Sequence, residues 1–280
     1  LLLTELKHTF TEFAQRMKND EMITLAKFLA ISGIILPMLP HKNLIPDINL
    51  TPYSIWLATV VLSGISYLSY LLKRYVFHES GVLVSGIIGG LYSSTATISV
   101  LARKSRKASE QEANEYVAAM LLAVSMMFLR FMILILIFSR EIFTSIYPYL
   151  LIMSVVAAVV AWFIHSRHRR SKDMADESED EDSSNPLEFK VALIFATLFV
   201  VFTVLTHYTL VYAGTGGLNL LSFVSGLSDI TPFILNLLQN TGSVAVLVVV
   251  ACSMQAIISN ILVNMFYALF FAGKGSKLRP

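Results

Sequence analysis

The stretch GVLVSGIIGGLYSSTATISVLARK, residues 81–104, decides how this chain must be interpreted. It is long and apolar enough to cross a bilayer, for which about 20 residues suffice, yet four glycines, three of them near its middle, precede five Ser and Thr residues at 93–99. A second stretch, GGLNLLSFVSGLSDITPFILNLLQ at 216–239, carries Gly226, Asp229 and Pro232 near its middle. Glycine and proline weaken or break helices. Both stretches therefore have the length of a spanning helix and the residues that interrupt one at mid-depth.

Uninterrupted apolar segments surround these two stretches. Hydrophobic residues make up 55% of the 280 residues and charged residues only 14%, against about a quarter charged in soluble domains. Helices satisfy their own backbone hydrogen bonds and can therefore lie in lipid. We predict an all-α integral membrane protein, a polytopic helical bundle, whose unbroken spanning segments are 22–39, 52–76, 114–138, 146–165, 187–213 and 244–272.

The basic residues favour one of two topologies. If all eight segments span, the Lys and Arg outside the helices divide equally between the two sides of the membrane. If 81–103 and 216–239 instead enter and return on one side, all of these residues except Lys42 and Arg140 gather on a single side. Cytoplasmic loops carry the excess of Lys and Arg. We therefore prefer the re-entrant topology with both termini cytoplasmic, and keep eight spanning helices as the alternative.

The order helix, helix, interrupted segment, long helix occurs twice. Gly90-Leu91 before Thr95 matches Gly226-Leu227 before Thr231, and downstream 123–126 (AVSM) is similar to 251–254 (ACSM). Three spanning helices in each half is an odd number, so the second half must be inverted. Inverted repeats with broken helices are a recurring plan of secondary transporters.

The predicted division of the chain follows from these segments. A linker at 166–186 separates the two halves. It is basic and then strongly acidic, and this composition predicts a solvated segment more strongly than a divalent-cation sensor. The units are an amphipathic interfacial helix (1–21), the first repeat core (22–138), a helix opening the second repeat (139–165), the charged cytoplasmic linker (166–186), the rest of the second repeat (187–273) and a cytoplasmic tail (274–280).

Two charged residues lie deep in apolar stretches, where an ionisable group is a functional hypothesis by default. Asp229 either caps the helix that begins near Thr231 or forms part of a site, and the two roles are compatible. Arg130 in the segment 114–138 either snorkels to a surface, pairs with Asp229 or binds an anionic substrate.

Neutral polar groups complete the candidate site. Asn260 and Asn264 lie one turn apart and face the segment of Asp229. Hydroxyls in the first stretch could replace the water around an ion, or could equally donate to the carbonyls of their own helix. We expect close helix packing at Gly64, Gly86 and Gly90, and we predict Gly89, Gly90 and Gly226 to be structural glycines. The predicted ion- or substrate-binding residues are Asp229, Ser93, Ser94, Thr95, Thr97, Asn260, Asn264, Arg130 and Thr231, with the metal left open.

Other classes of function lack their motifs. The single cysteine, Cys252, excludes an internal disulfide and a cysteine-based metal site. No phosphate-binding loop and no catalytic Ser/His/Asp order is present. We expect no enzyme activity, no cofactor and no nucleic-acid binding.

Several motifs resemble one known family. Five stretches are similar to the family called domain of unknown function 4010: GIIGGLYSSTATISVLARKSRK (86–107), the long helix with Phe128-Leu129-Arg130, NPLEFKVAL (185–193), SGLSDI (225–230) and SNILVN (259–264). In bacteria this domain often follows an MgtC/SapB-type membrane domain. The resemblance implies a bacterial inner-membrane protein, an MgtC-like domain as a partner missing from this chain, and an association with magnesium.

The expected function is membrane transport or permeation of a small ion or solute, with a divalent cation such as magnesium among the candidates. The alternative is a membrane regulatory module that binds a partner and moves nothing, for which small-residue helix faces are sufficient. The bilayer is the expected environment, and a homo-oligomer is compatible with either function.

Overall fold

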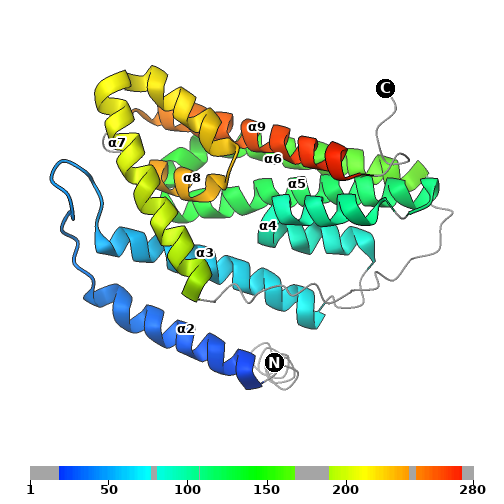
Figure 1. Cartoon of the computed structure of the whole chain (residues 1–280), viewed down its shortest axis with the longest axis horizontal. Coiled ribbons are helices and arrows are strands. Elements are labelled where there is room, and N and C mark those ends of the chain that lie inside the picture. The colour runs from blue at the N-terminus through cyan, green and yellow to red at the C-terminus, as the bar shows by residue number, and fades with distance from the viewer. Residues whose placement is uncertain (1–18, 77–80, 107, 168–188, 240–243, 273–280) are drawn as a thin grey trace.

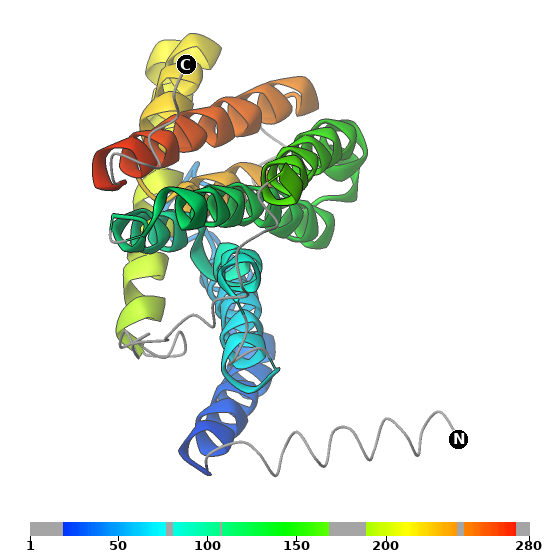
Figure 2. The same cartoon turned by 90° about the vertical axis from the view of Figure 1, so that its right-hand side faces the viewer.

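The computed structural model describes residues 19–76, 81–106, 108–167, 189–239 and 244–272, which are almost wholly helical (Figure 1 and Figure 2). Seven helices of this part are long and apolar enough to cross a membrane. This confirms the predicted all-α, multi-pass membrane class. The elements are α2 (Asn19–Met38), α3 (Pro52–Leu71) with a π-helical turn η1 (Leu72–Val76), α4 (Val82–Lys104), α5 (Glu110–Phe138), α6 (Arg140–Arg167), α7 (Phe189–Gly226), α8 (Ile230–Gln239) and α9 (Val246–Phe271).

Three predicted units fall on residues that are not described. These are residues 1–18 of the interfacial helix, residues 168–186 of the charged linker, and the tail 274–280. The predicted boundaries between the repeats stay predictions. The helix predicted at 146–165 begins earlier, at Arg140. Ser139 is the single residue between the end of α5 and the start of α6.

The helix α4 is folded back on itself at Ser93. The backbone there is extended, with φ −158° and ψ 107°. A Cβ built on Gly89 would lie 2.5 Å from Thr97 Oγ1, whereas eight residues of one straight helix span roughly 12 Å. We name residues 82–104 the first hairpin. Each of its halves is about half the length that a bilayer core requires, so this segment does not cross as one rod.

A second interrupted segment follows a break inside α7. Gly214 has φ 58° and ψ −153°, a conformation that is essentially restricted to glycine. Residues 215–226 then run parallel to α9, because Asn219 contacts Cys252 and, further along both helices, Gly226 contacts Asn260. A turn at 227–229 leads into α8. We name residues 215–239 the second hairpin; its interruption lies where Gly226 and Asp229 predicted it.

The two hairpins start from opposite ends of the helical bundle. The first hairpin starts and finishes at the end of the bundle where α9 finishes. There, Arg106 Nη2, just beyond the hairpin, donates to the Phe270 carbonyl at 3.0 Å. The end of α8 lies at the other end of the bundle, where Gln239 Nε2 donates to the Ser54 carbonyl at 3.3 Å near the start of α3. Figure 1 shows these two ends on its right and left sides.

Basic residues gather at one of these ends. Arg74, Arg103 and Arg106 lie at the end where α3 and α9 finish, and the Arg103 guanidinium is 4.9 Å from the Phe271 ring centre. Lys42 and Arg140 lie at the other end, beside the start of α3 and of α6. The described basic residues therefore have the one-sided distribution on which the re-entrant prediction rests.

The core lies between α5, α6, α7, α8 and α9. Phe128, Phe199 and Phe233 are almost fully buried there. Outer faces carry large exposed apolar side chains, such as Trp162, Tyr212 and Phe266, with 72%, 82% and 66% of their surface accessible. An apolar exterior of this kind fits contact with lipid rather than with water.

Two polar contacts fix helices to each other. Ser125 on α5 and Ser154 on α6 each donate from Oγ to the other's carbonyl, at 2.9 and 3.1 Å. At the start of α2, Glu21 is buried and forms an ion pair with Arg74 at 2.8 Å. The Tyr70 hydroxyl donates to Glu21 at 2.9 Å. This cluster attaches the otherwise exposed α2 to α3, and no pattern in the sequence predicts it.

Candidate functional site

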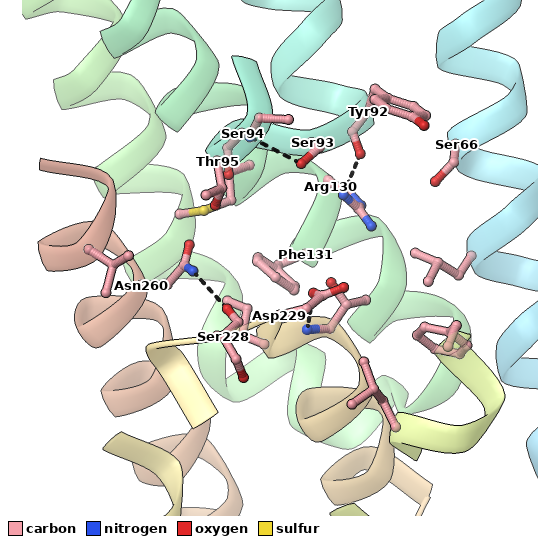
Figure 3. A pocket seen from close by; sticks show the side chains of 18 of the residues that line it. Ser66, Tyr92, Ser93, Ser94, Thr95, Arg130, Phe131, Ser228, Asp229 and Asn260 are labelled. Carbon is pink, nitrogen blue, oxygen red and sulfur yellow. Dashed lines mark hydrogen bonds between the residues drawn. The ribbon is translucent and has the colours of Figure 1, made fainter. Parts of the chain in front are cut away.

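The tips of the two hairpins meet at a cavity of about 520 Å³ (Figure 3). Residues 92–96 of the first hairpin and 227–231 of the second form two of its walls. The middle of α3, the first part of α7, and the long helices α5 and α9 form the others. In the view of Figure 1 the first part of α7 crosses α3 steeply, and the two helices are in contact. The cavity therefore lies at the centre of the bundle, where all of these elements converge.

Glycines let each hairpin pack directly on the long helix that follows it. A Cβ on Gly90 would lie 2.5 Å from Ala123 Cα, and one on Gly226 would lie 2.5 Å from the Ala256 carbonyl oxygen. Neither distance is compatible with a larger residue unless the backbone moves. The predicted close packing is thus confirmed at Gly90, and also at Gly86, where a Cβ would lie 2.3 Å from the Ala119 carbonyl oxygen. It is wrong for Gly64, which has nothing within 4 Å.

The two glycine contacts relate the long helices in a different register from the sequence similarity. The similarity matches 123–126 on α5 to 251–254 on α9, whereas the residue that Gly226 contacts as Gly90 contacts Ala123 is Ala256, five positions beyond Ala251. The predicted repeat stays a prediction.

Each hairpin tip caps its second half-helix. The amide of Ala96 donates to Ser93 Oγ at 3.4 Å, and the amide of Thr231 donates to Asp229 Oδ1 at 3.0 Å. The predicted capping role of Asp229 is confirmed. Both half-helices direct their N-termini, which carry partial positive charge, toward the cavity. Asp229 is itself exposed, and Figure 3 shows its carboxylate at the cavity.

Side chains of the long helices satisfy the carbonyls at the ends of the first half-helices. Arg130 Nη1 donates to the Tyr92 carbonyl at 2.8 Å. Asn260 Nδ2 donates to the carbonyls of Gly226 and Ser228 at 3.2 and 3.4 Å, and Asn264 Nδ2 donates to Asn260 Oδ1 at 3.1 Å. The interruption therefore leaves these carbonyls paired.

Arg130 does not snorkel to a surface, because it lines the cavity and is bound to the first hairpin tip. It faces Asp229 across the cavity (Figure 3). No ion pair within 4 Å joins the two in the described residues. The Arg130 Nε is buried and has no hydrogen-bond partner in the same part of the chain. The guanidinium is therefore only partly satisfied by the protein.

Most of the predicted site residues meet at this cavity. Thr97 instead packs against Gly89 inside the first hairpin, and Asn264 lies behind Asn260. Ser63 and Ser66 of α3 line the cavity but were missed, since nothing distinguishes them from other serines in an apolar helix. The predicted residues that line it are Ser93, Ser94, Thr95, Arg130, Asp229, Thr231 and Asn260.

The described part of the chain contains no preformed metal-binding site. Over the described ranges, no group of three or more His, Cys, Asp or Glu side chains could hold an ion. The cavity contributes one carboxylate and one guanidinium, with hydroxyls and amides around them. Such a lining suits reversible binding of a small polar species.

The fold and the cavity define a polytopic helical membrane protein with two broken-helix hairpins. A family model for a domain of unknown function, DUF4010, matches residues 60–272, and the chain belongs to this family. It is also 27% identical over 200 residues to an uncharacterized protein of Aquifex aeolicus (strain VF5), covering 70% of this chain and 85% of that one. No solved structure matches the chain. The association with an MgtC-like domain stays a prediction.

Proposed function

We propose that this protein transports a small ion or solute across the bacterial inner membrane through the cavity between the hairpin tips. The observation that carries the proposal is the meeting of two broken helices from opposite ends of the bundle at one polar cavity. Irregular backbone at membrane depth is tolerated where it is buried in protein or lines a water-filled cavity. Transporters place their substrate sites at such interruptions.

The spacing of the lining residues supports an inverted repeat. On α3 the cavity contacts residues 62, 63 and 66, and on α7 it contacts 194, 195 and 198. On α5 it contacts 127, 130 and 131, and on α9 it contacts 260, 263 and 267, so that the first two positions on each helix share their spacing. The capping residues Ser93 and Asp229 also match. We therefore place the pseudo-two-fold axis through the cavity, so that access can alternate between two similar halves.

The positive charges orient the protein. We assign the end that carries Arg74, Arg103 and Arg106 to the cytoplasm, since basic residues are retained there. The first hairpin then enters from the cytoplasm and the second from the opposite side.

Magnesium is disfavoured as the substrate that binds at this cavity. A divalent cation needs six or more oxygens, usually including several carboxylates. Asp229 is the only carboxylate in the lining, and the Arg130 guanidinium shares the cavity with it. We therefore propose that the transported solute is one that can bind beside the Arg130 guanidinium.

The test is a flux assay with the purified chain in liposomes, run over a panel of small anions, cations and zwitterions. We expect uptake of at least one solute, and strongly reduced uptake with Asp229→Asn, which keeps the cap but not the charge. A correctly inserted wild-type protein that moves no solute would remove transport and favour the regulatory alternative.

A labelling experiment tests the orientation independently. In a Cys252→Ser background, Ala108→Cys lies beyond the first hairpin and Lys42→Cys lies at the other end of the bundle. We expect an impermeant thiol reagent added outside the cell to modify Lys42→Cys alone. Modification of Ala108→Cys from outside would overturn the assigned topology.

A further inference from the structure

The two halves of the cavity differ in chemistry at matching positions. On α3 the cavity wall presents Ser63 and Ser66, whereas the positions with the same spacing on α7 are Phe195 and Leu198. The tip of the first hairpin adds the hydroxyls of residues 93–95. The α3 wall and the first hairpin tip are therefore polar and the α7 wall is apolar, which fits an amphipathic ligand with one charged group.

The polar side carries a positive charge, Arg130, whose hydrogen-bond donors are not all paired with the protein. Arg130 extends from α5 beside the first hairpin tip, with one nitrogen on the Tyr92 carbonyl and Nε buried without a partner in the described chain. The corresponding position on α9 is the apolar Val263. A planar guanidinium binds carboxylates through paired hydrogen bonds. Beside it, the half-helix after Ser93 has a neutral cap, so its N-terminal dipole is not cancelled by a charged side chain.

The opposite tip carries the compensating charge. Asp229 lies across the cavity from Arg130, and the remaining titratable groups of the lining are Tyr92 and Tyr267. With Arg130 positive and Asp229 negative, the empty cavity is neutral. An added monovalent anion leaves it with one excess negative charge, and protonation of Asp229 restores neutrality. Binding of an anion and of a proton must then favour each other.

We propose that the cavity binds a small organic anion with an apolar body, its carboxylate on Arg130 and the first hairpin tip, together with a proton on Asp229. The proton joins the Asp229 carboxylate as a carboxylic acid and leaves with the ligand. A cavity of about 520 Å³ is large enough for such a molecule. This inference rests on the proposed transport function, for which it names the substrate class and the coupling ion.

The test measures equilibrium binding to the purified full chain with three probes that separate charge from shape. Benzoate carries a carboxylate and an apolar ring, benzylamine carries the same ring with the opposite charge, and formate carries the carboxylate alone. We expect benzoate to bind at least about tenfold more tightly than either of the others. Preferred binding of benzylamine, or equal binding of formate and benzoate, would overturn the inference.

Variants test the two charges. Arg130→Gln should weaken benzoate binding by about tenfold or more, while Arg140→Gln, at the exposed start of α6, should leave it unchanged. Lowering the pH from neutral to mildly acidic, where benzoate stays anionic, should tighten binding to the wild type but not to Asp229→Asn. Unchanged affinity in Arg130→Gln, or the same pH dependence in Asp229→Asn, would contradict the assignment.

A further variant covers the case in which Arg130→Gln does not fold. Ser66→Leu gives α3 the side chain that α7 has at the matching position, and it does not touch the bond between Arg130 and Tyr92. We expect it to weaken benzoate binding without loss of the fold. Unchanged binding there would overturn the assignment of the polar side.

The outcomes separate this inference from the proposed function. Benzoate binding without flux of any solute would sustain the ligand class and remove transport. Flux of a cation in a protein that binds no organic anion would sustain transport and remove the ligand class.

Discussion

The first and second hairpins are built by the same means but carry opposite charges. In each, a glycine packs on the long helix that follows, a tip residue caps the second half-helix, and a side chain of the long helix binds a tip carbonyl. The first hairpin has a neutral cap, Ser93, and a charged donor, Arg130. The second has a charged cap, Asp229, and a neutral donor, Asn260.

This comparison separates what the fold needs from what the site needs. The glycine contact, the cap and the carbonyl donor are present in both hairpins, so they are the requirements for ending a helix inside the bundle. The charges differ, although a neutral residue fulfils each structural role in one of the two hairpins. The fold therefore does not require the charges of Arg130 and Asp229, and these charges belong to the site.

We expect the largest loss of stability from a substitution at the contact between a hairpin glycine and the long helix, which both hairpins share. Gly90→Ala would place a methyl group 2.5 Å from the Ala123 backbone, and we expect a loss of about 3 kcal/mol in the free energy of unfolding. Thermal unfolding in detergent measures it. Gly64→Ala, with open space around it, is the matched control and should not destabilise. Equal stability of the two variants would refute the close contact between hairpin and helix.

A change that affects only the second hairpin comes next. Gly214 has open space around it, so Gly214→Ala acts through the backbone alone. Its conformation costs a non-glycine residue about 1–3 kcal/mol. We expect a lower unfolding temperature and intact helix content by circular dichroism. The first hairpin has no positive-φ residue among those described, so Gly81→Ala, at the extended residue before α4, should cost much less.

The carbonyl donors offer a similar comparison. Asn260→Ala would leave the Gly226 and Ser228 carbonyls without this partner, at a cost of about 1–3 kcal/mol. Asn264→Ala removes only the bond to Asn260 and should cost less. Unfolding midpoints of the two variants test the order. A larger loss for Asn264→Ala would show that the tip does not depend on Asn260.

The smallest effects on stability are expected at the caps. Ser93→Ala removes a long hydrogen bond and should cost about 0.5–1 kcal/mol. Asp229→Asn keeps a good capping residue and should be nearly neutral for folding, while it abolishes the proton dependence of anion binding. A strong destabilisation by Asp229→Asn would instead assign the carboxylate a structural role.

The sequence was sufficient to place the helices and the interruptions. Hydropathy located the long helices, and the glycines and hydroxyls of 81–104 located the fold-back near Ser93. Asp229 could be assigned as a cap because Thr231 and the following apolar run are local to it. All of these inferences depend on residues close together in the chain.

Contacts between distant segments could not be predicted in the same way. The partner of Arg130 is a backbone carbonyl 38 residues away, and any residue type can supply a carbonyl. Ser63 and Ser66 became part of the site only because α3 crosses the first part of α7 at the cavity. The pairing of Gly226 with Ala256 depends on how two helices dock, which leaves no motif in the sequence.

The single residue between α5 and α6 limits how the molecule can move. Ser139 is too short a tether to let one helix slide along the other, and the reciprocal serine bonds hold them at mid-length. These two helices must then travel as one rigid block. Any opening toward either side of the membrane falls to the short half-helices, whose displacement would shift Ser93 or Asp229 relative to that block.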